Sequence, residues 1–280
     1  MYNQYALITG ASEGLGKFLA IECAKKEMNL VLVALPGSSL HILKSYLLKT
    51  FDVDVLCIET DLSGESNCHK LYEEIKCKKI SISVLINNAG IGGTFSFDEK
   101  ETSYYTELIS LNVIAPTLLC RLFLSELKKN APSFIMNVGS LAGVFALPNK
   151  QVYSGTKSFL VSFSKSLRRE LKKDNVSVSV LCPGGMNTSW RLTMENRMMG
   201  TWMSRQSVME PSEVAAIGIR KMFQRKETII SGFWNRFFLF GDRLFPKRIK
   251  EYLVHYQAAK WKRTQSLVPA FQPHLTTIKN

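Results

Sequence analysis

Short apolar runs rich in β-branched residues alternate along the chain with longer amphipathic segments, and this alternation limits the fold more than any other feature. We predict strands at residues 5–9, 30–34, 53–59, 83–86, 133–138, 176–181 and 228–230. Helices are predicted at residues 14–26, 39–50, 67–78, 102–129, 152–173 and 211–225. This order predicts parallel strands joined by crossover helices, and nearly uninterrupted apolar strands indicate that both sheet faces are covered. We therefore expect an α/β fold with a doubly wound parallel sheet of about seven strands.

A change of composition near residue 231 divides the chain. We predict a main domain at 1–231 and a partly helical C-terminal extension at 232–280. Residues 228–263 interleave nine aromatic side chains with eight basic residues and only two acidic ones. That mixture is typical of a membrane interface, and it would also suit a cover over a substrate site or a subunit contact. No nucleic-acid-binding module accompanies it, so we expect no nucleic-acid partner.

Composition favours a protein of the cytoplasm. The formal net charge of the 280 residues is +13, which favours an anionic ligand or surface. No apolar run approaches the roughly 18–20 residues of a spanning helix, and the N-terminus does not resemble a signal peptide. Six scattered cysteines indicate free thiols in a reducing compartment, and four histidines lack metal-ligand spacing. We predict a cytoplasmic location without a metal, with peripheral membrane contact as an option.

A glycine-rich segment follows the first predicted strand. Residues 9–16 read Thr-Gly-Ala-Ser-Glu-Gly-Leu-Gly and lead into the first helix. The glycines permit a tight turn and close backbone approach, and the helix N-terminus offers unpaired N–H groups to a pyrophosphate. A turn that only joins strand to helix is the alternative, but the position favours a Rossmann-type dinucleotide site.

The end of the second predicted strand bears on the choice of dinucleotide. Residues 34–39 read Ala-Leu-Pro-Gly-Ser-Ser. This segment has no carboxylate for a ribose 2′-hydroxyl, as NAD requires, and no arginine for a 2′-phosphate. Ser38, Ser39 and adjacent N–H groups could still hold a phosphate. We therefore favour NADP(H) and keep NAD(H) as the alternative.

Tyr153 and Lys157 stand four residues apart in a predicted helix, thirteen and seventeen residues after Ser140. Residues i and i+4 share a helix face, so the phenol and the ammonium would point the same way. A nearby cation lowers the pKa of a tyrosine from its usual value of about 10, which suits a general acid–base. The spacing alone is also typical of an amphipathic helix with a solvated lysine.

Further motifs occur in order between these. Asp61-Leu62 follows the third strand, Asn87-Asn88-Ala89-Gly90 follows the fourth, Asn112 lies in the long helix, and Pro183-Gly184 with Thr188 follows the sixth. Together the set resembles the short-chain dehydrogenase/reductase family over residues 5–231. The segments at 230–236 and 246–248 look like the branch with long-chain 3-ketoacyl and 3-ketosphinganine reductases and some hydroxysteroid dehydrogenases. This resemblance implies an NAD(P)(H)-dependent oxidoreductase that interconverts a ketone and a secondary alcohol.

The resemblance also implies residue roles. Tyr153 would exchange a proton with the substrate oxygen, Ser140 would bind that oxygen, and Lys157 would lower the pKa of Tyr153 and bind the nicotinamide ribose. Asn112 would hold a relay water and complete the catalytic set. The implied cofactor set is Gly10, Ser12, Glu13, Gly14, Leu15, Gly16, Ser38, Asp61, Leu62, Asn88, Ala89, Gly90, Tyr153, Lys157, Pro183, Gly184 and Thr188. As isolated features, most of these would be interpreted as turn or helix residues. Glu13 and Leu35 depart from the pattern, because NADP-preferring members often carry Arg or Lys there.

Residues 190–207 are rich in Met and Trp, which suits an apolar, adaptable pocket or the ordinary packing of a lid. Apolar walls could come from Phe95, Phe97, Val144, Phe145 and Leu147. We expect an apolar, lipid-like ketone or alcohol as substrate. The family commonly pairs its two long helices, so a homodimer or homotetramer is implied. Two alternatives are a non-catalytic dinucleotide-binding protein that docks a membrane or partner through its tail, and a methyltransferase.

Overall fold

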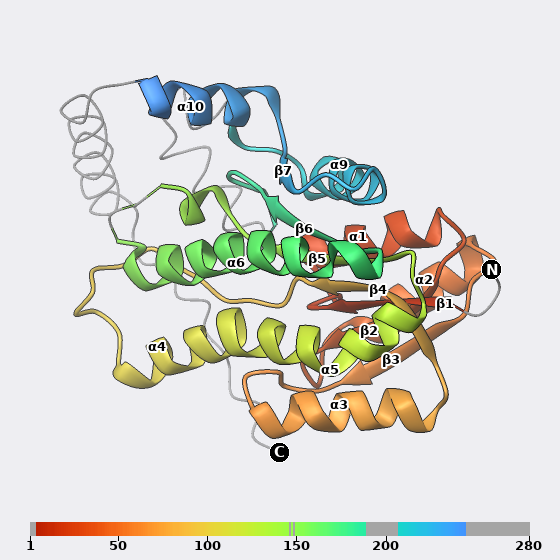
Figure 1. The fold of residues 1–280 in the computed structure, drawn as a ribbon. Coiled ribbons are helices and arrows are strands. Elements are labelled where there is room, and N and C mark those ends of the chain that lie inside the picture. The colour runs from red at the N-terminus through yellow and green to blue at the C-terminus, as the bar shows by residue number, and fades with distance from the viewer. Residues whose placement is uncertain (1–3, 146, 148, 189–206, 245–280) are drawn as a thin grey trace, which may run out of the picture.

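The centre of the molecule is a parallel sheet, as predicted. The computed structural model describes residues 4–145, 147, 149–188 and 207–244 (Figure 1). Seven strands follow the order β3-β2-β1-β4-β5-β6-β7, and each neighbouring pair is parallel. The strands are β1 (Gln4–Thr9), β2 (Asn29–Ala34), β3 (Val55–Glu59), β4 (Ser81–Asn87), β5 (Ser133–Val138), β6 (Val176–Cys182) and β7 (Thr228–Ile230). Their ends differ from the predicted ends by at most two residues, which confirms the doubly wound sheet.

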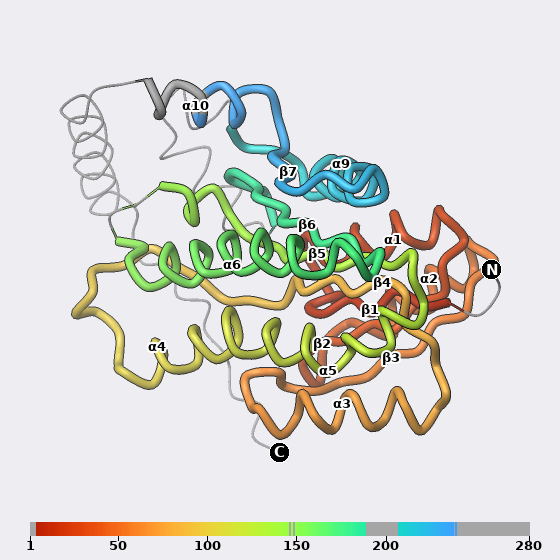
Figure 2. Tube along the Cα trace, in the orientation of Figure 1, coloured from red at the N-terminus to blue at the C-terminus, as the bar shows by residue number. Residues whose placement is uncertain are grey.

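Helices cover both faces of the sheet (Figure 2). One layer holds α1 (Gly14–Ala24), α2 (Leu40–Thr50) and α9 (Pro211–Phe223), and the other holds α3 (Glu65–Cys77), α5 (Ala115–Lys129) and α6 (Gln151–Glu170). Side chains of β1 pack against both helix layers, because alternate side chains of a strand point to opposite faces. Ala6 and Ile8 pack in the first core with Leu19, while Leu7 packs in the second with Phe123.

The long helix predicted at 102–129 is not uniform. It consists of α4 (Thr102–Ile109), a π-helical turn (Ser110–Ile114) and α5, so the prediction of a single α-helix is wrong at 110–114. Such turns are often found at functional sites. Within the described ranges, this helix is long and apolar enough to cross a membrane by length and composition, contrary to the expectation that no segment is. Its Leu119 and Phe123 are buried in the core against the sheet.

The C-terminal extension begins as a helix, α10 (Phe233–Leu244). Two short 3-10 turns, η2 (Leu141–Gly143) and η3 (Leu171–Asp174), follow β5 and α6. Residues 245–280 and most of the predicted substrate segment, 189–206, lie outside the described residues. The boundary at residue 231 stays a prediction, and Asn235 of α10 is buried against the main domain.

Candidate active site

The predicted site residues gather at the carboxyl edge of the sheet. In parallel α/β sheets, ligands bind at this edge where neighbouring strands lead to helices on opposite faces. Here β1 and β4 are neighbours; β1 leads to α1 in one layer and β4 leads to α4 and α5 in the other. The glycine-rich loop follows β1, Asn88 follows β4, Ser140 follows β5 and Pro183 follows β6. The topology therefore brings together residues that are far apart in the sequence.

The glycine-rich loop is shaped by close backbone contacts. Gly10 and Gly14 have φ angles of +63° and +52°, which other residues rarely adopt. A Cβ atom at Gly16 would overlap the carbonyl oxygen of Gly10. Helix α1 begins at Gly14 without a side-chain cap, and no acidic residue lies in its first turn. This loop and its helix N-terminus fit the pyrophosphate of a dinucleotide; Ser12, Glu13 and Leu15 belong to the same segment.

Asn88 holds the loop in place. Its Nδ2 donates to the carbonyl oxygens of Thr9 and Gly10, both at 3.0 Å. The backbone N–H groups of Asn88 and Ala89 donate to Thr9 Oγ1, also at 3.0 Å. On the other side, Thr188 lies 3.4 Å from the position that a Cβ atom at Gly14 would take. The structure thus places Asn88, Ala89 and Thr188 around the glycine-rich loop.

Ser140, Tyr153 and Lys157 form one cluster. The Ser140 and Tyr153 side chains share a hydrogen bond, which lowers the pKa of Tyr153. Burial has the larger effect and raises that pKa, and Cys182 raises it further. The Lys157 Nζ lies 5.7 Å from the centre of the Tyr153 ring. The direction of the Tyr153 pKa is therefore opposite to the one expected from the Tyr153–Lys157 spacing alone, because burial disfavours phenolate.

Lys157 is buried, with 5% of its surface exposed. Its Nζ donates to the carbonyl oxygen of Val138 at 2.9 Å. Burial lowers the pKa of Lys157 from 10.5 to about 8, while Cys182 raises it. A buried ammonium in contact with a neutral acceptor can bind further hydroxyl oxygens, since an ammonium has three donors.

Asn112 lies in the π-helical turn and connects the loop at Ile91 to helix α6. Its Oδ1 accepts from the backbone N–H of Ile91 at 3.0 Å, and its Nδ2 donates to the carbonyl oxygen of Ile91 at 2.9 Å. The same Nδ2 donates to Thr156 Oγ1 at 3.2 Å. Gly90 lies between Asn112 and Lys157, since a Cβ atom at Gly90 would come 2.8 Å from Asn112 Oδ1 and 3.5 Å from Lys157 Nζ. Asn112 is therefore close to Lys157, as the predicted set requires.

The remaining predicted residues lie farther along the edge. Asp61 accepts from Ser63 N at 2.9 Å and is exposed, whereas the Leu62 side chain is buried in the core, with 4% of its surface exposed. Ser38 Oγ donates to a Glu59 carboxylate oxygen at 3.4 Å. Because its side chain is buried, Leu62 can contact a cofactor only through its backbone.

Sequence reasoning missed several residues of the site. Cys182 ends β6 and is buried at the same edge, where a Cβ atom at Gly139 would lie 3.3 Å from its Sγ. Asn235 of α10 packs on Gly184, where a Cβ atom would lie 2.7 Å from the Asn235 side chain. A Cβ atom at Gly92 would lie 2.7 Å from the Tyr153 ring. Cys182 could have been found, because it directly precedes Pro183-Gly184, but nothing in the sequence pointed to Asn235.

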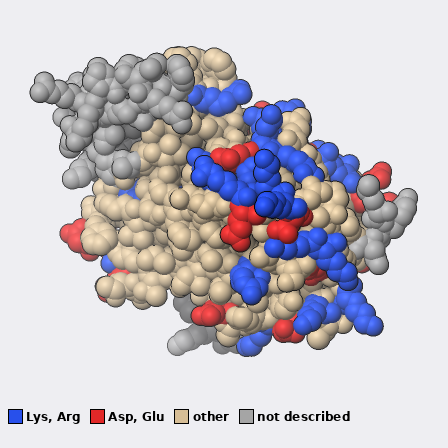
Figure 3. Space-filling view, in the orientation of Figure 1, with Lys and Arg blue, Asp and Glu red and all other residues tan. Residues whose placement is uncertain are grey.

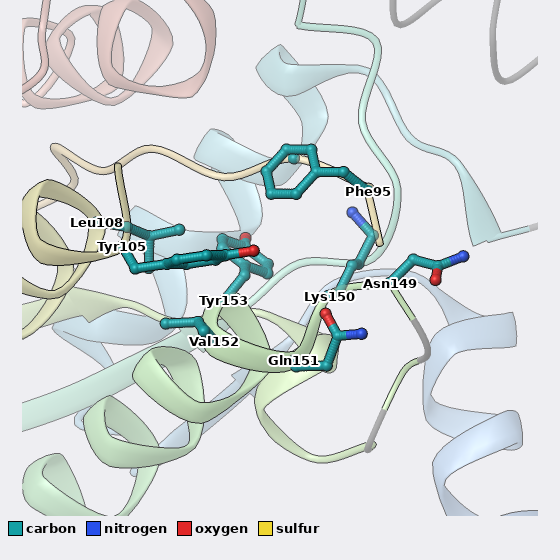
Figure 4. Close-up of a pocket in the computed structure, with 9 residues that line it drawn as sticks. Phe95, Tyr105, Leu108, Asn149, Lys150, Gln151, Val152 and Tyr153 are labelled. Atoms are coloured by element: carbon teal, nitrogen blue, oxygen red, sulfur yellow. The ribbon is translucent and has the colours of Figure 1, made fainter. Parts of the chain in front are cut away.

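A pocket opens beside Tyr153 (Figure 4). Its apolar walls come from Phe95, Tyr105, Leu108 and Val152, and Asn149, Lys150 and Gln151 add polar groups. Phe95, a predicted wall residue, lines the pocket. Its ring packs edge-on against Tyr104, with 5.2 Å between the ring centres. Phe97 is 61% exposed and stacks on Tyr105, and Val144 is 42% exposed.

Comparison with known proteins identifies the family. Residues 4–198 match the model of the short chain dehydrogenase family. The chain belongs to the short-chain dehydrogenases. This confirms the predicted family and an oxidoreductase class, with a fold that binds a nicotinamide dinucleotide, and the methyltransferase alternative is wrong.

Individual relatives agree with this family. The chain is 29% identical over 244 residues to a very-long-chain 3-oxoacyl-CoA reductase of Vanderwaltozyma polyspora, covering 83% of this chain and 69% of the relative. It is 27% identical over 235 residues to human 17-beta-hydroxysteroid dehydrogenase type 3, covering 82% and 74%. The structure resembles L-sorbose reductase of Gluconobacter frateurii, crystallised with NADPH and L-sorbose, with a TM-score of 0.74, 25% identity and coverage of 82% and 95%. Both named relatives fall in the branch that the sequence resembles.

Proposed function

We propose that this short-chain dehydrogenase reduces a ketone on an apolar, lipid-like substrate to a secondary alcohol, with Tyr153 as general acid. The observation that carries the proposal is the cluster of Ser140, Tyr153 and Lys157 next to the glycine-rich loop. A nicotinamide dinucleotide held by the glycine-rich loop would supply the hydride. Burial keeps the Tyr153 hydroxyl protonated, which is the form that donates a proton to a carbonyl oxygen.

Each side chain of the cluster has a defined task in this proposal. The Ser140 hydroxyl binds the substrate oxygen and stabilises the charge that develops on it. Tyr153 transfers its proton to that oxygen, and Lys157 stabilises the phenolate that remains. Asn112 connects Ile91 to Thr156, which holds the 90–92 loop against the helix that carries Tyr153 and Lys157.

Replacement of the Tyr153 hydroxyl tests the mechanism. Tyr153→Phe should lower kcat at least a hundredfold and leave dinucleotide binding within about twofold, because only proton transfer is lost. Steady-state kinetics with ketones of graded chain length and dinucleotide fluorescence titrations provide the two measurements. Tyr46→Phe, an exposed tyrosine on α2, is the matched control. Full turnover by the Tyr153 variant would refute the proposal, and loss of activity in both variants would point to damaged folding.

NADP(H) is the favoured dinucleotide in this proposal, with NAD(H) as the alternative. The absence of a carboxylate from residues 34–39, where NAD binding normally requires one, supports it, together with the NADPH found in the L-sorbose reductase crystal. The apolar substrate is supported by the names of the two relatives.

We also propose a homodimer formed through α4, α5 and α6. Ile109 of α4, Ile114 of the π-helical turn before α5 and Phe159 of α6 are 41%, 41% and 38% exposed. Figure 3 shows that the surface over this region carries few charged side chains, whereas Lys and Arg gather over the C-terminal end of α6. An uncharged surface with exposed apolar residues suits a subunit interface.

Peripheral membrane contact from the cytoplasmic side is proposed for the extension. Phe233 and Phe237 of α10 are 66% and 53% exposed and stack on each other, beside Arg236. Aromatic and basic side chains together favour a membrane interface. Flotation with anionic vesicles should recover the protein, and Phe233→Ser/Phe237→Ser should lower the bound fraction severalfold. Equal flotation of both proteins would refute a role for α10, and a variant that keeps dinucleotide affinity is correctly folded.

A further inference from the structure

A carboxylate of the third strand lies beside the end of the second. Ala34, the last residue of β2, is in register with Glu59, the last residue of β3. The pairing continues beyond the strands, because Thr60 N donates to the carbonyl oxygen of Ala34 at 2.8 Å. Neighbouring strands lie about 4.8 Å apart. The Glu59 backbone therefore lies about one strand spacing from the end of β2, where residues 34–39 contain no carboxylate.

The Glu59 side chain reaches the loop between β2 and α2. Its Oε2 accepts from the backbone N–H of Gly37 at 3.1 Å, and its Oε1 accepts from Ser38 Oγ at 3.4 Å. Gly37 has a φ of +74°, and a Cβ atom there would meet nothing within 4 Å. The carboxylate thus lies at an open part of the loop. It accepts hydrogen bonds from Gly37 N and Ser38 Oγ, the donors that a phosphate would need.

Glu59 lies where the adenosine ribose of a dinucleotide would bind. Dinucleotide-binding α/β folds hold the adenosine ribose at the end of the second strand. A carboxylate there accepts a hydrogen bond from a 2′-hydroxyl, and it repels a 2′-phosphate.

We propose that Glu59 determines the cofactor specificity of this site. Its carboxylate binds the 2′-hydroxyl of NAD(H) and competes with the 2′-phosphate of NADP(H) for Gly37 and Ser38, so that the site accepts both dinucleotides. The inference rests on the dinucleotide site of the proposed function. A unit charge about 5 Å from a doubly charged phosphate in a water-like medium corresponds to roughly a tenfold change in Kd.

Fluorescence titration of the full chain with NADPH and with NADH tests this role. In Glu59→Gln, the ratio of the NADH Kd to the NADPH Kd should rise about tenfold, because NADPH binds more tightly and NADH more weakly. Glu59→Asp retains the charge and should stay within threefold of the wild-type ratio. Glu73→Gln removes another exposed carboxylate, on α3, and should leave the ratio within twofold.

Two results would overturn the inference. An unchanged ratio in Glu59→Gln would show that the carboxylate does not distinguish the dinucleotides, and an equal rise in Glu73→Gln would show only an effect of net charge. Failure of the proposed function is separate, since it is measured by the turnover of Tyr153→Phe. If wild-type protein binds neither dinucleotide, the inference and the proposed function are both wrong.

Discussion

The buried ammonium of Lys157 destabilises the folded protein at neutral pH, and Lys157→Met removes that charge while it preserves most of the volume. The pKa of Lys157 falls from 10.5 to about 8 because of burial. Each pKa unit corresponds to about 1.4 kcal/mol, so a charged Lys157 costs roughly 3 kcal/mol. Loss of the hydrogen bond from Nζ to the Val138 carbonyl offsets about 1 kcal/mol of this. The variant should therefore be about 2 kcal/mol more stable at pH 7, and inactive.

The sign of the pH dependence follows from the direction of the shift. Below pH 8 Lys157 is protonated in both the folded and unfolded states, so its cost is present in full. Between pH 8 and 10.5 the folded state releases the proton first, and wild-type stability rises by about 1.4 kcal/mol per pH unit relative to the variant. The advantage of Lys157→Met should thus shrink by about 2 kcal/mol between pH 8 and pH 9.5.

Urea unfolding of both proteins at pH 7, 8 and 9.5 measures these differences, and the other titrating groups cancel because the two proteins share them. Lys173→Met, an exposed lysine beyond α6, is the control and should change the free energy of unfolding by less than about 0.5 kcal/mol. A stability difference that stays constant from pH 7 to 9.5 would refute the reasoning, because it would mean that Lys157 titrates alike in both states.

Three further predictions concern other parts of the molecule. Gly16→Ala should weaken dinucleotide binding at least tenfold and lower stability by roughly 2 kcal/mol, since its Cβ would overlap Gly10. The control, Gly155→Ala, faces open space on α6 and should stabilise the protein by about 0.5–1 kcal/mol. Similar dinucleotide affinities of the wild type and Gly16→Ala in fluorescence titrations would contradict this. Asn112→Ala removes three hydrogen bonds and should lower the free energy of unfolding in urea by about 2–3 kcal/mol, so a loss below 0.5 kcal/mol would speak against the network. Phe159→Glu should convert a dimer to a monomer in light scattering with little loss of stability, and a dimer that persists would exclude α6 from the interface.

Local patterns explain why much of this protein could be predicted. The apolar runs of β1 to β7 and the amphipathic segments between them reflect periods of two and 3.6 residues, which neighbouring residues determine. The positions of Ser140, Tyr153 and Lys157 follow from the chain order of a family whose motifs stand at constant spacing. The π-helical turn at Asn112 could not be predicted in the same way, because contacts with Ile91 and Thr156 from other segments accompany it.

The sequence by itself determined the doubly wound sheet and the family. The tertiary structure decided the direction of the Tyr153 pKa and the burial of Lys157. It also brought Glu59 to the end of β2, where a search along residues 34–39 finds no carboxylate. The physical reason is the same in each case. Hydrophobic periodicity is a property of adjacent residues, whereas burial and proximity across strands depend on how the whole chain packs.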